Sequence, residues 1–543
     1  MQIYRCFHTD RMRSNYVPWV ILLTVMLFAA AVRLRLLAVP LERDEGEYAY
    51  AGQLILQGIP PYAQVYSMKM PGVYGMYALI MTVFGQTCGG IHLGLLVVNV
   101  AAILLMFLLG KKLFGQFAGV AAATAFALLS LGQRVFGIFA HTEHFVIFFV
   151  LSGILLLLRF IDCRRWPYLF GGALLLGLSF LMKQHAAVFI LFAGLYLLYV
   201  ELSRTRFMWK VSVTGYVLFF AGVLLPFAAA CLVLWRLGVF EKFWFFTFSY
   251  SREYALNTSL LTGLANLKNM MLPILSSASL IWILAAVGLT ALWWNNQIRQ
   301  HRVFITGFLV FSFLAICPGL YFREHYFILL LPPAALLAGI GFTCLVNVFA
   351  RSKSTLISRV APVLLSVVVL LHTIYQQWDF FFTMVPAAVS YKIYYGNPFP
   401  ESLEIAKFIK DRSSKDDYIA IIGSEPQIYF YSGRRSATGY IYTYPLMENQ
   451  PYAVRMQKDM IREIEAARPK FLVFVNVNTS WLMQRNSEKM IFNWFKEYRQ
   501  KYYQTVGIID IPESGQTVYR WGSNATGYSP RSKSWLSVAQ RKD

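Results

Sequence analysis

The first long apolar run of the chain is Val17-Pro-Trp-Val-Ile-Leu-Leu-Thr-Val-Met-Leu-Phe-Ala-Ala-Ala-Val-Arg-Leu-Arg-Leu-Leu-Ala-Val39. An α-helix needs about 20 residues to cross a hydrocarbon core of ~30 Å, and this run is long enough. It is too long for the core of a signal peptide, shows no cleavage site and is followed by further apolar runs. We therefore expect it to be a membrane anchor.

The composition of the whole chain agrees with a membrane protein. Of its 543 residues, 57% are hydrophobic and only 14% are charged, whereas soluble proteins carry about 25% charged residues. The segment 71–85 is short, and we expect a juxtamembrane or re-entrant helix there. We predict a polytopic α-helical membrane protein with eleven spans: the first run and the segments near 91–109, 117–132, 145–158, 168–182, 186–200, 212–235, 272–294, 303–320, 326–349 and 360–378.

The charge pattern predicts the orientation of these spans. The formal net charge is +22, and Lys and Arg collect in cytoplasmic connections of membrane proteins. With residues 1–16 in the cytoplasm, the basic clusters all fall on the inner side, whereas a full span at 71–85 would place the later ones outside. Most of the basicity is thus explained without a nucleic-acid partner, and the cytoplasmic connections are 110–116, 159–167, 201–210, 295–302 and 350–359.

The pattern changes to that of a soluble α/β domain at about residue 400. After a linker at 381–399, helices and strands alternate, which predicts a small three-layer extracytoplasmic domain over 400–522. The tail 523–543 is polar and rich in Ser, and we expect it to be disordered. The predicted helices are 401–411, 456–467 and 489–499, and the predicted strands are 418–422, 471–475, 505–511 and 517–521.

The outer loop after the first span begins Leu41-Glu-Arg-Asp-Glu-Gly-Glu-Tyr-Ala-Tyr50. Its four carboxylates lie next to the membrane, where ionisable groups are costly and tend to be functional. A solvated charge run at the interface is the alternative. A carboxylate among tyrosines can act as a general base. The loop composition leaves the choice among the carboxylates open, and the aromatics of this loop include Tyr48, Tyr62 and Tyr66.

Further charged residues occur in the outer loops. Lys69 is either an anchor that snorkels to the interface or a point charge for a phosphate. Lys183, Arg323 and His325 allow the same two interpretations. Glu143, between His141 and His144, is a helix N-terminal acid, a second acid or an oxygen ligand of a divalent ion, Mg²⁺ or Mn²⁺. The sequence has neither a Walker A loop nor a dinucleotide-binding glycine motif, so we expect no nucleotide cofactor.

Taken in order, these motifs resemble the C-superfamily membrane glycosyltransferases. The resemblance rests on Asp44-Glu45, on Lys69-Met-Pro71, on Thr142-Glu143, on the hairpin that ends at Lys183-Gln184, and on His325-Tyr-Phe before a Pro-Pro span. It is strongest to the bacterial branch with protein O-mannosyltransferase-like and lipid A aminoarabinose transferase-like enzymes.

The resemblance implies a transmembrane glycosyltransferase domain at 17–380, with a catalytic first outer loop at 40–90, in a bacterial inner membrane. The implied donor is a polyprenyl-phosphate sugar, and the implied acceptor is a hydroxyl of a glycan, lipid or protein. Asp44 would be the base of an inverting transfer, with Glu45 as the second candidate, and the donor phosphate would be held by Lys69, Lys183, Arg323 and His325. A flippase or exporter of a lipid-linked sugar and a membrane-anchored ligand sensor are the alternatives.

Overall fold

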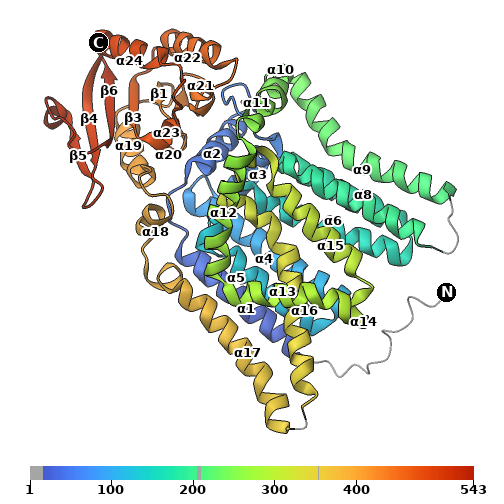
Figure 1. Ribbon diagram of the computed structural model, residues 1–543. Helices are drawn as coiled ribbons and strands as arrows, with labels where there is room; N and C mark the ends of the chain where they lie inside the picture. The colour runs from blue at the N-terminus through green and yellow to red at the C-terminus, as the bar shows by residue number, and fades with distance from the viewer. Residues whose placement is uncertain (1–15, 205–208, 353, 543) are drawn as a thin grey trace.

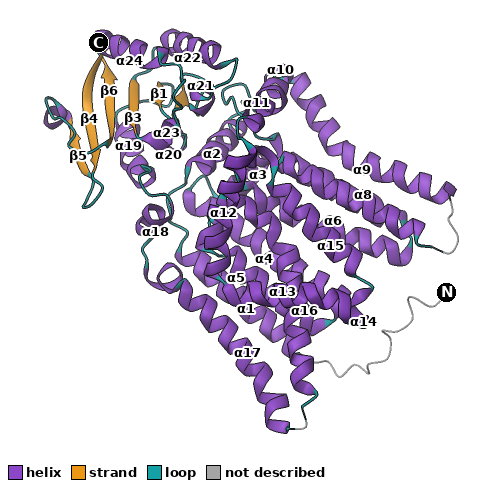
Figure 2. Cartoon of the chain, in the orientation of Figure 1, coloured by secondary structure: helices purple, strands orange, loops and turns teal. Residues whose placement is uncertain are grey.

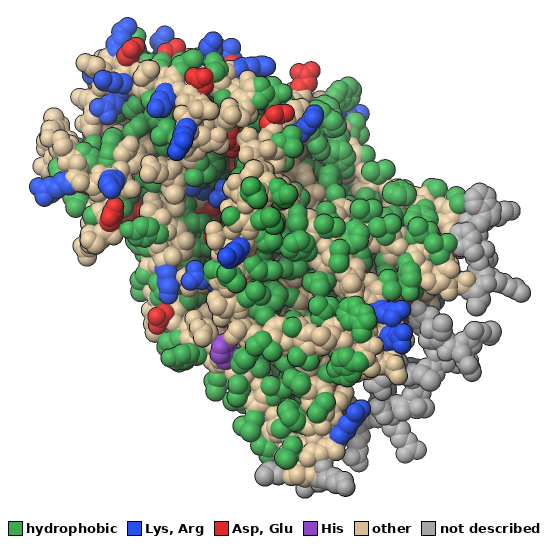
Figure 3. Space-filling model, viewed as in Figure 1, with side chains coloured by type: hydrophobic (Ala, Val, Ile, Leu, Met, Phe, Trp, Pro, Cys, Tyr) green, Lys and Arg blue, Asp and Glu red, His purple; other side chains and the backbone are tan. Residues whose placement is uncertain are grey.

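The computed structural model describes residues 16–204, 209–352 and 354–542. A bundle of apolar helices makes up most of the molecule, and a smaller α/β domain covers one end of it (Figure 1). Charged side chains gather over the α/β domain, whereas hydrophobic side chains dominate the visible face of the bundle (Figure 3). The N-terminal arginines, Arg206 and Lys353 lie outside the described residues, so their place in the cytoplasm stays a prediction.

Within the part of the chain that the structure describes, six helical segments are long and apolar enough to cross a membrane by length and composition: Val17–Arg35, Cys88–Phe114, Thr142–Cys163, Gln184–Leu202, Ser212–Arg236 and Glu324–Ala350. They belong to α1 (Val17–Arg35), α4 (Cys88–Phe114), α6 (Thr142–Cys163), α8 (Ala187–Leu202), α9 (Trp209–Arg236) and α16 (Leu331–Ala350). A bent pair, broken by 102°, counts as a seventh if it is one span. It consists of α12 (Leu260–Ser277) and α13 (Ser279–Trp294).

The other predicted spans are helices too, but shorter ones. They are α5 (Gln116–Ser130), α7 (Trp166–Met182), α15 (Arg302–Ile316) and the part of α17 (Thr355–Gln376) from Val360 onward. Each of the eleven predicted runs is thus helical, which confirms a polytopic membrane protein. The segment 71–85 forms α3 (Pro71–Phe84), whose 14 residues reach about 21 Å, and that is less than the hydrocarbon thickness.

The connection between the bundle and the α/β domain is partly helical. It contains a π-helical turn, η6 (Asp379–Thr383), and the short helix α18 (Pro386–Ile393). The Arg35 guanidinium, at the end of α1, donates to the carbonyl oxygens of Phe381 at 2.7 Å and of Met384 at 2.5 Å. These bonds satisfy carbonyl groups that an irregular turn leaves open, so Arg35 ties the linker to the bundle.

A six-stranded sheet forms the core of the C-terminal domain (Figure 2). The strand order is β2-β1-β3-β6-β4-β5. β1 pairs in parallel with β2 and β3, whereas β6 runs antiparallel between β3 and β4. The strands are β1 (Tyr418–Ile422), β2 (Arg435–Ser436), β3 (Phe471–Asn476), β4 (Tyr503–Ile511), β5 (Val518–Trp521) and β6 (Ser534–Arg541).

Helices cover both faces of this sheet, as the alternation of elements predicts. Ile419 and Ile421 of β1 pack with residues of α19 (Phe399–Asp411), and that cluster continues into the core of the membrane bundle. Ala420 and Ile422 point to the other face and pack with α22 (Ala453–Ala467) and α24 (Met490–Tyr502). Side chains of a strand alternate between faces, so the domain has three layers and one of them is continuous with the bundle.

The prediction of a disordered tail at 523–543 is wrong for its described part. β6 lies within the sheet, and Leu536, Val538 and Ala539 are buried there. The segment is too short and too rich in Ser to stand out by composition. Its order comes from pairing with β3 and β4 on both sides, which are contacts between residues far apart in the sequence. The domain therefore extends to residue 541.

Candidate active site

A cavity of about 410 Å³ lies between the outer loops of the bundle and the C-terminal domain. Its lining includes Asp44 and Lys69 from the first outer loop, His325 from a later one, and Tyr442 and Glu448 from the C-terminal domain. The volume falls within the range of about 300–1,000 Å³ that is usual for small-molecule sites. Residues from both parts of the molecule therefore share one site.

Asp44 lies in the first turn of α2 (Arg43–Leu56) and contacts two groups through the same oxygen. Lys69 Nζ is 3.3 Å from Asp44 Oδ1, and the hydroxyl of Tyr442 donates to that oxygen at 3.0 Å. Burial raises the pKa of the Asp44 carboxyl, but Lys69 first, then His325, His141 and the hydrogen bond from Tyr442, together lower it by more, so the pKa lies well below its usual value. Asp44 is therefore an ionised carboxylate in this state.

A capping box fixes the start of α2. The carboxylate of Glu42 accepts from the Glu45 amide at 2.8 Å, and Glu45 accepts in return from the Glu42 amide at 3.3 Å, which satisfies two open donors of the helix. Glu45 Oε1 also lies 3.1 Å from His92 Nε2 and accepts from the Ala140 amide at 2.5 Å. These contacts turn Glu45 away from the cavity, so the structure does not place it beside Asp44 as a second base.

Tyrosines hold Lys69 in its position. The hydroxyl of Tyr62 donates to the Lys69 carbonyl at 2.7 Å, and Lys69 Nζ lies 5.4 Å from the ring centre of Tyr48. Burial alone would lower the pKa of the ammonium group, but Asp44 and then Glu47 raise it above its usual value. Lys69 is therefore charged, with Tyr48 and Tyr62 as its support. Of the three predicted tyrosines, only Tyr66 lines the cavity.

A second buried ion pair lies next to this site. Glu143, in the first turn of α6, forms an ion pair with Lys183, and its Oε1 is 4.0 Å from His325 Nε2. Lys183 Nζ also lies 3.8 Å from the ring centre of Tyr326. Neither Glu143 nor Lys183 lines the cavity. Of the four predicted phosphate-binding residues, Lys69, Arg323 and His325 line the cavity. The fourth, Lys183, forms an ion pair with Glu143 instead.

Three side chains of the site are close enough to hold a metal ion. Asp44, His141 and His325 each offer a ligand atom, and these atoms lie within 4.8 Å of one another. The Nδ1 atoms of both histidines are buried, and neither has a hydrogen-bond partner among the described residues. Burial and the neighbouring His325 lower the pKa of His141, so its ring is neutral, as metal ligation requires.

These three residues could bind a divalent ion, but they are not the ligands predicted from the sequence. The predicted oxygen ligand is Glu143, which is not one of the three residues. One carboxylate with two imidazoles suits Zn²⁺ or Mn²⁺ better than Mg²⁺, which prefers oxygen ligands alone. The ligand set therefore favours Zn²⁺ or Mn²⁺ over Mg²⁺.

Sequence reasoning missed the contribution of the C-terminal domain. Tyr442 and Glu448 follow β2 in the chain and reach the cavity from outside the bundle. The hydroxyl of Tyr250 donates to Glu448 at 2.5 Å, and burial raises the pKa of Glu448 to about 7. The alternating tyrosines in Tyr440-Ile-Tyr-Thr-Tyr444 were the available signal.

Comparison with known proteins identifies a family over part of the chain. Residues 69–230 match a family described as dolichyl-phosphate-mannose-protein mannosyltransferase. This segment contains Lys69, Glu143 and Lys183, and it ends before the C-terminal domain. No curated protein matches the chain by sequence.

Solved structures share the fold over nearly the whole chain. ArnT from Cupriavidus metallidurans has TM-scores of 0.60 in the apo state and 0.59 bound to undecaprenyl phosphate, with 15% identity over 97% of this chain and 98% of that one. The oligosaccharyltransferase AglB from Archaeoglobus fulgidus, in complex with an inhibitory peptide and a dolichol-phosphate, has a TM-score of 0.54 and 14% identity over 97% of this chain and 76% of that one.

An oligosaccharyltransferase structure from Archaeoglobus fulgidus in complex with Zn and sulfate has a TM-score of 0.56 and 15% identity, over 92% of this chain and 72% of that one. Likeness at this identity establishes the fold alone. Residues 69–230 are thus similar to the dolichyl-phosphate-mannose-protein mannosyltransferase family, and the chain shares the fold of ArnT over nearly its whole length.

Proposed function

We propose that the protein is an inverting glycosyltransferase that moves a sugar from a polyprenyl-phosphate donor to an acceptor hydroxyl at the outer face of the membrane. The observation that carries this proposal is the Asp44–Lys69 pair. A carboxylate and an ammonium group lie 3.3 Å apart on the wall of a cavity at the end of an apolar helical bundle. Sugar transfer from a lipid phosphate needs a proton acceptor and a cation in such a place.

The acceptor oxygen forms a bond to the anomeric carbon as its proton passes to the Asp44 carboxylate. The bond between that carbon and the phosphate oxygen breaks, and its electron pair stays on the lipid phosphate. Lys69 stabilises the negative charge that grows on this phosphate. Attack from the face opposite the phosphate inverts the configuration at the anomeric carbon.

The contact between Lys69 and Asp44 also suggests how the base is activated. A carboxylate paired with Lys69 is a weak base, because its pKa lies well below its usual value. A lipid phosphate that enters the cavity competes with Asp44 for the same ammonium group. As Lys69 turns to the phosphate, the Asp44 carboxylate loses the charge that lowered its pKa and becomes a stronger base.

The related structures support a lipid-phosphate substrate. ArnT was solved with undecaprenyl phosphate and AglB with a dolichol-phosphate and a peptide. We assign the donor phosphate of this chain to Lys69, with Arg323 and His325 on the same cavity wall. The acceptor would enter from the side of the C-terminal domain. We place this side outside a bacterial inner membrane, with the N-terminus in the cytoplasm.

The ligand atoms of Asp44, His141 and His325 lie close enough together to bind a divalent cation. Held by Asp44, His141 and His325, such an ion would offset negative charge on the donor phosphate. His141 and His325 would then bind the ion through Nδ1, the ring nitrogen that has no hydrogen-bond partner among the described residues. Lys69 would still donate a hydrogen bond to the donor phosphate.

We expect chelation to lower the rate of sugar transfer by about tenfold or more, because one phosphate-neutralising charge is lost. The rate should return on addition of Zn²⁺ or Mn²⁺, and the His325→Ala variant should lose no further activity on chelation. The metal content is followed by mass spectrometry. Full activity in protein shown to be metal-free would remove the cation from the proposal and leave Asp44 as base alone.

The proposed reaction is tested with purified wild-type protein in vesicles that contain a radiolabelled polyprenyl-phosphate sugar. We expect the sugar–phosphate bond to be cleaved with release of polyprenyl phosphate, and the rate to depend on a hydroxyl acceptor. Movement of the intact lipid-sugar between leaflets without cleavage would favour a flippase. Saturable binding with neither cleavage nor movement would favour a sensor.

A further inference from the structure

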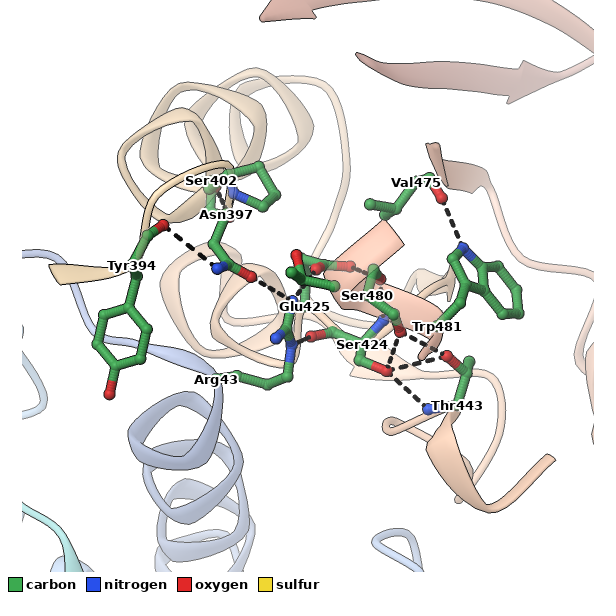
Figure 4. Close-up of polar contacts among 12 residues, drawn as sticks. Arg43, Tyr394, Asn397, Ser402, Ser424, Glu425, Thr443, Val475, Ser480 and Trp481 are labelled. Carbon is green, nitrogen blue, oxygen red and sulfur yellow. Dashed lines mark hydrogen bonds and ion pairs between the residues drawn. The ribbon is translucent and has the colours of Figure 1, made fainter. Parts of the chain in front are cut away.

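The C-terminal domain places its usual ligand-binding edge against the catalytic loop. In α/β domains, ligands bind outside the carboxyl ends of the parallel strands. Here Ser424 and Glu425 follow β1, and Ser480 lies in the short helix α23 (Asn478–Trp481) that follows β3; the three form a buried polar group (Figure 4). The side chain that enters this group comes from the other part of the molecule: it is Arg43, the residue before Asp44.

Arg43 uses all of its donor nitrogens in this place (Figure 4). Its Nε donates to the Ser424 carbonyl, and its Nη2 donates to Glu425 at 2.8 Å and to Asn397 at 3.0 Å. Its Nη1 donates to the Tyr444 hydroxyl at 2.8 Å. The Ser480 hydroxyl in turn donates to Glu425 at 2.7 Å. A buried guanidinium with a carboxylate and neutral acceptors is a geometrically specific contact.

One face of α2 continues this contact. Gly46 lies so near the C-terminal domain that a Cβ atom there would be 2.6 Å from the Gln427 nitrogen. One turn later, Tyr50 accepts from the Ser436 amide at 2.8 Å. Positions three or four residues apart share a helix face, so Arg43, Gly46 and Tyr50 form one docked face. Asp44 lies on a different face and lines the cavity.

The domain also touches Asp44 itself. Tyr442, in the segment between β2 and α21 (Tyr444–Met447), donates its hydroxyl to Asp44 Oδ1 at 3.0 Å. Lys69 contacts the same oxygen at 3.3 Å. Both contacts are made to Oδ1, so together they orient the Asp44 carboxylate through one of its two oxygens.

We propose that the C-terminal domain is a working part of the catalytic centre, in which the Arg43 contact fixes α2 and Tyr442 is a positioning residue for the Asp44 carboxylate. The inference rests on the proposed function, because it gives Asp44 the role of the base. A carboxylate free to rotate would spend less time in the geometry for proton transfer, and small misplacements of reacting groups cost up to about 10²-fold in rate.

The test compares Tyr442→Phe with Tyr528→Phe. Tyr528 is a matched control, because its hydroxyl donates to a carboxylate oxygen, that of Asp510, at 2.9 Å, and it lies in the same domain away from the cavity. We expect Tyr442→Phe to lower kcat by about 10- to 100-fold while the KM for the lipid donor changes less than twofold. Tyr528→Phe should keep both constants.

Hydrogen–deuterium exchange gives a readout that does not depend on turnover. The backbone amides of α2 should exchange at the wild-type rate in Tyr442→Phe and faster in Glu425→Gln, where Arg43 loses its charged partner. A Tyr442→Phe enzyme with kcat within twofold of wild type would overturn the positioning role, and so would faster exchange in α2 of that variant. If the wild-type protein cleaves no donor, the proposed function fails. If the α2 amides exchange at the wild-type rate in Glu425→Gln, the Arg43 contact does not hold α2 in place.

Discussion

Asp44→Asn should lower kcat for sugar transfer by about 10²- to 10⁴-fold, the range that general-base catalysis supplies. Asn has nearly the size of Asp, and it can still accept from Tyr442 and Lys69, which lie within 3.3 Å of Oδ1. It cannot take up the proton of the acceptor. The measurement is single-turnover release of polyprenyl phosphate at saturating donor.

The control is Asp162→Asn. Asp162 also pairs with a lysine, Lys112, but it lies in the last turn of α6, at the opposite end of that helix from Glu143, and does not line the cavity. Surface pairs of this kind contribute little to stability, so this variant should keep wild-type kinetics. A rate for Asp44→Asn within a factor of three of wild type would show that another group takes the acceptor proton.

The fold followed from the sequence wherever the signal was local. The strand Tyr418–Ile422 was predicted with its observed bounds, because a short buried apolar run that ends at Gly423 is readable without knowing its partners. β6 was missed for the opposite reason. Its residues 534–541 are buried by pairing with two strands from other parts of the chain, and their composition alone is that of a polar tail.

The same distinction applies to the site. Asp44 and Lys69 stood out because charged residues next to a membrane span are costly, and the structure places them 3.3 Å apart. The contact between Asp44 and Tyr442 could not be predicted, because 398 positions separate the two residues in the chain. Glu45, the second candidate for the base, contacts His92 instead, because the next position of a helix points in another direction.

Lys69 is the second residue whose loss should have a large effect. It is the cation nearest to Asp44 among the described side chains of the cavity, and the charges of Asp44 and Glu47 keep it protonated. If it stabilises the leaving phosphate, its charge matters more in the transition state than in the bound donor. Replacing it should therefore affect kcat more than KM.

We expect Lys69→Gln to lower kcat by about 10²- to 10³-fold, as the loss of one preorganised donor to a developing anion does. Lys69→Arg should keep part of the rate, because it keeps the charge.

Product inhibition by polyprenyl phosphate distinguishes the role of Lys69 from that of Asp44. Without Lys69 the phosphate loses a positive partner, so the inhibition constant should rise about tenfold. Asp44→Asn removes a nearby negative charge, so the inhibition constant should fall or stay the same. The control is Lys470→Gln, since Lys470 pairs with Asp417 at the surface of the C-terminal domain and neither residue lines the cavity. Equal inhibition constants in Lys69→Gln and wild type would mean that Arg323 and His325, and not Lys69, hold the phosphate.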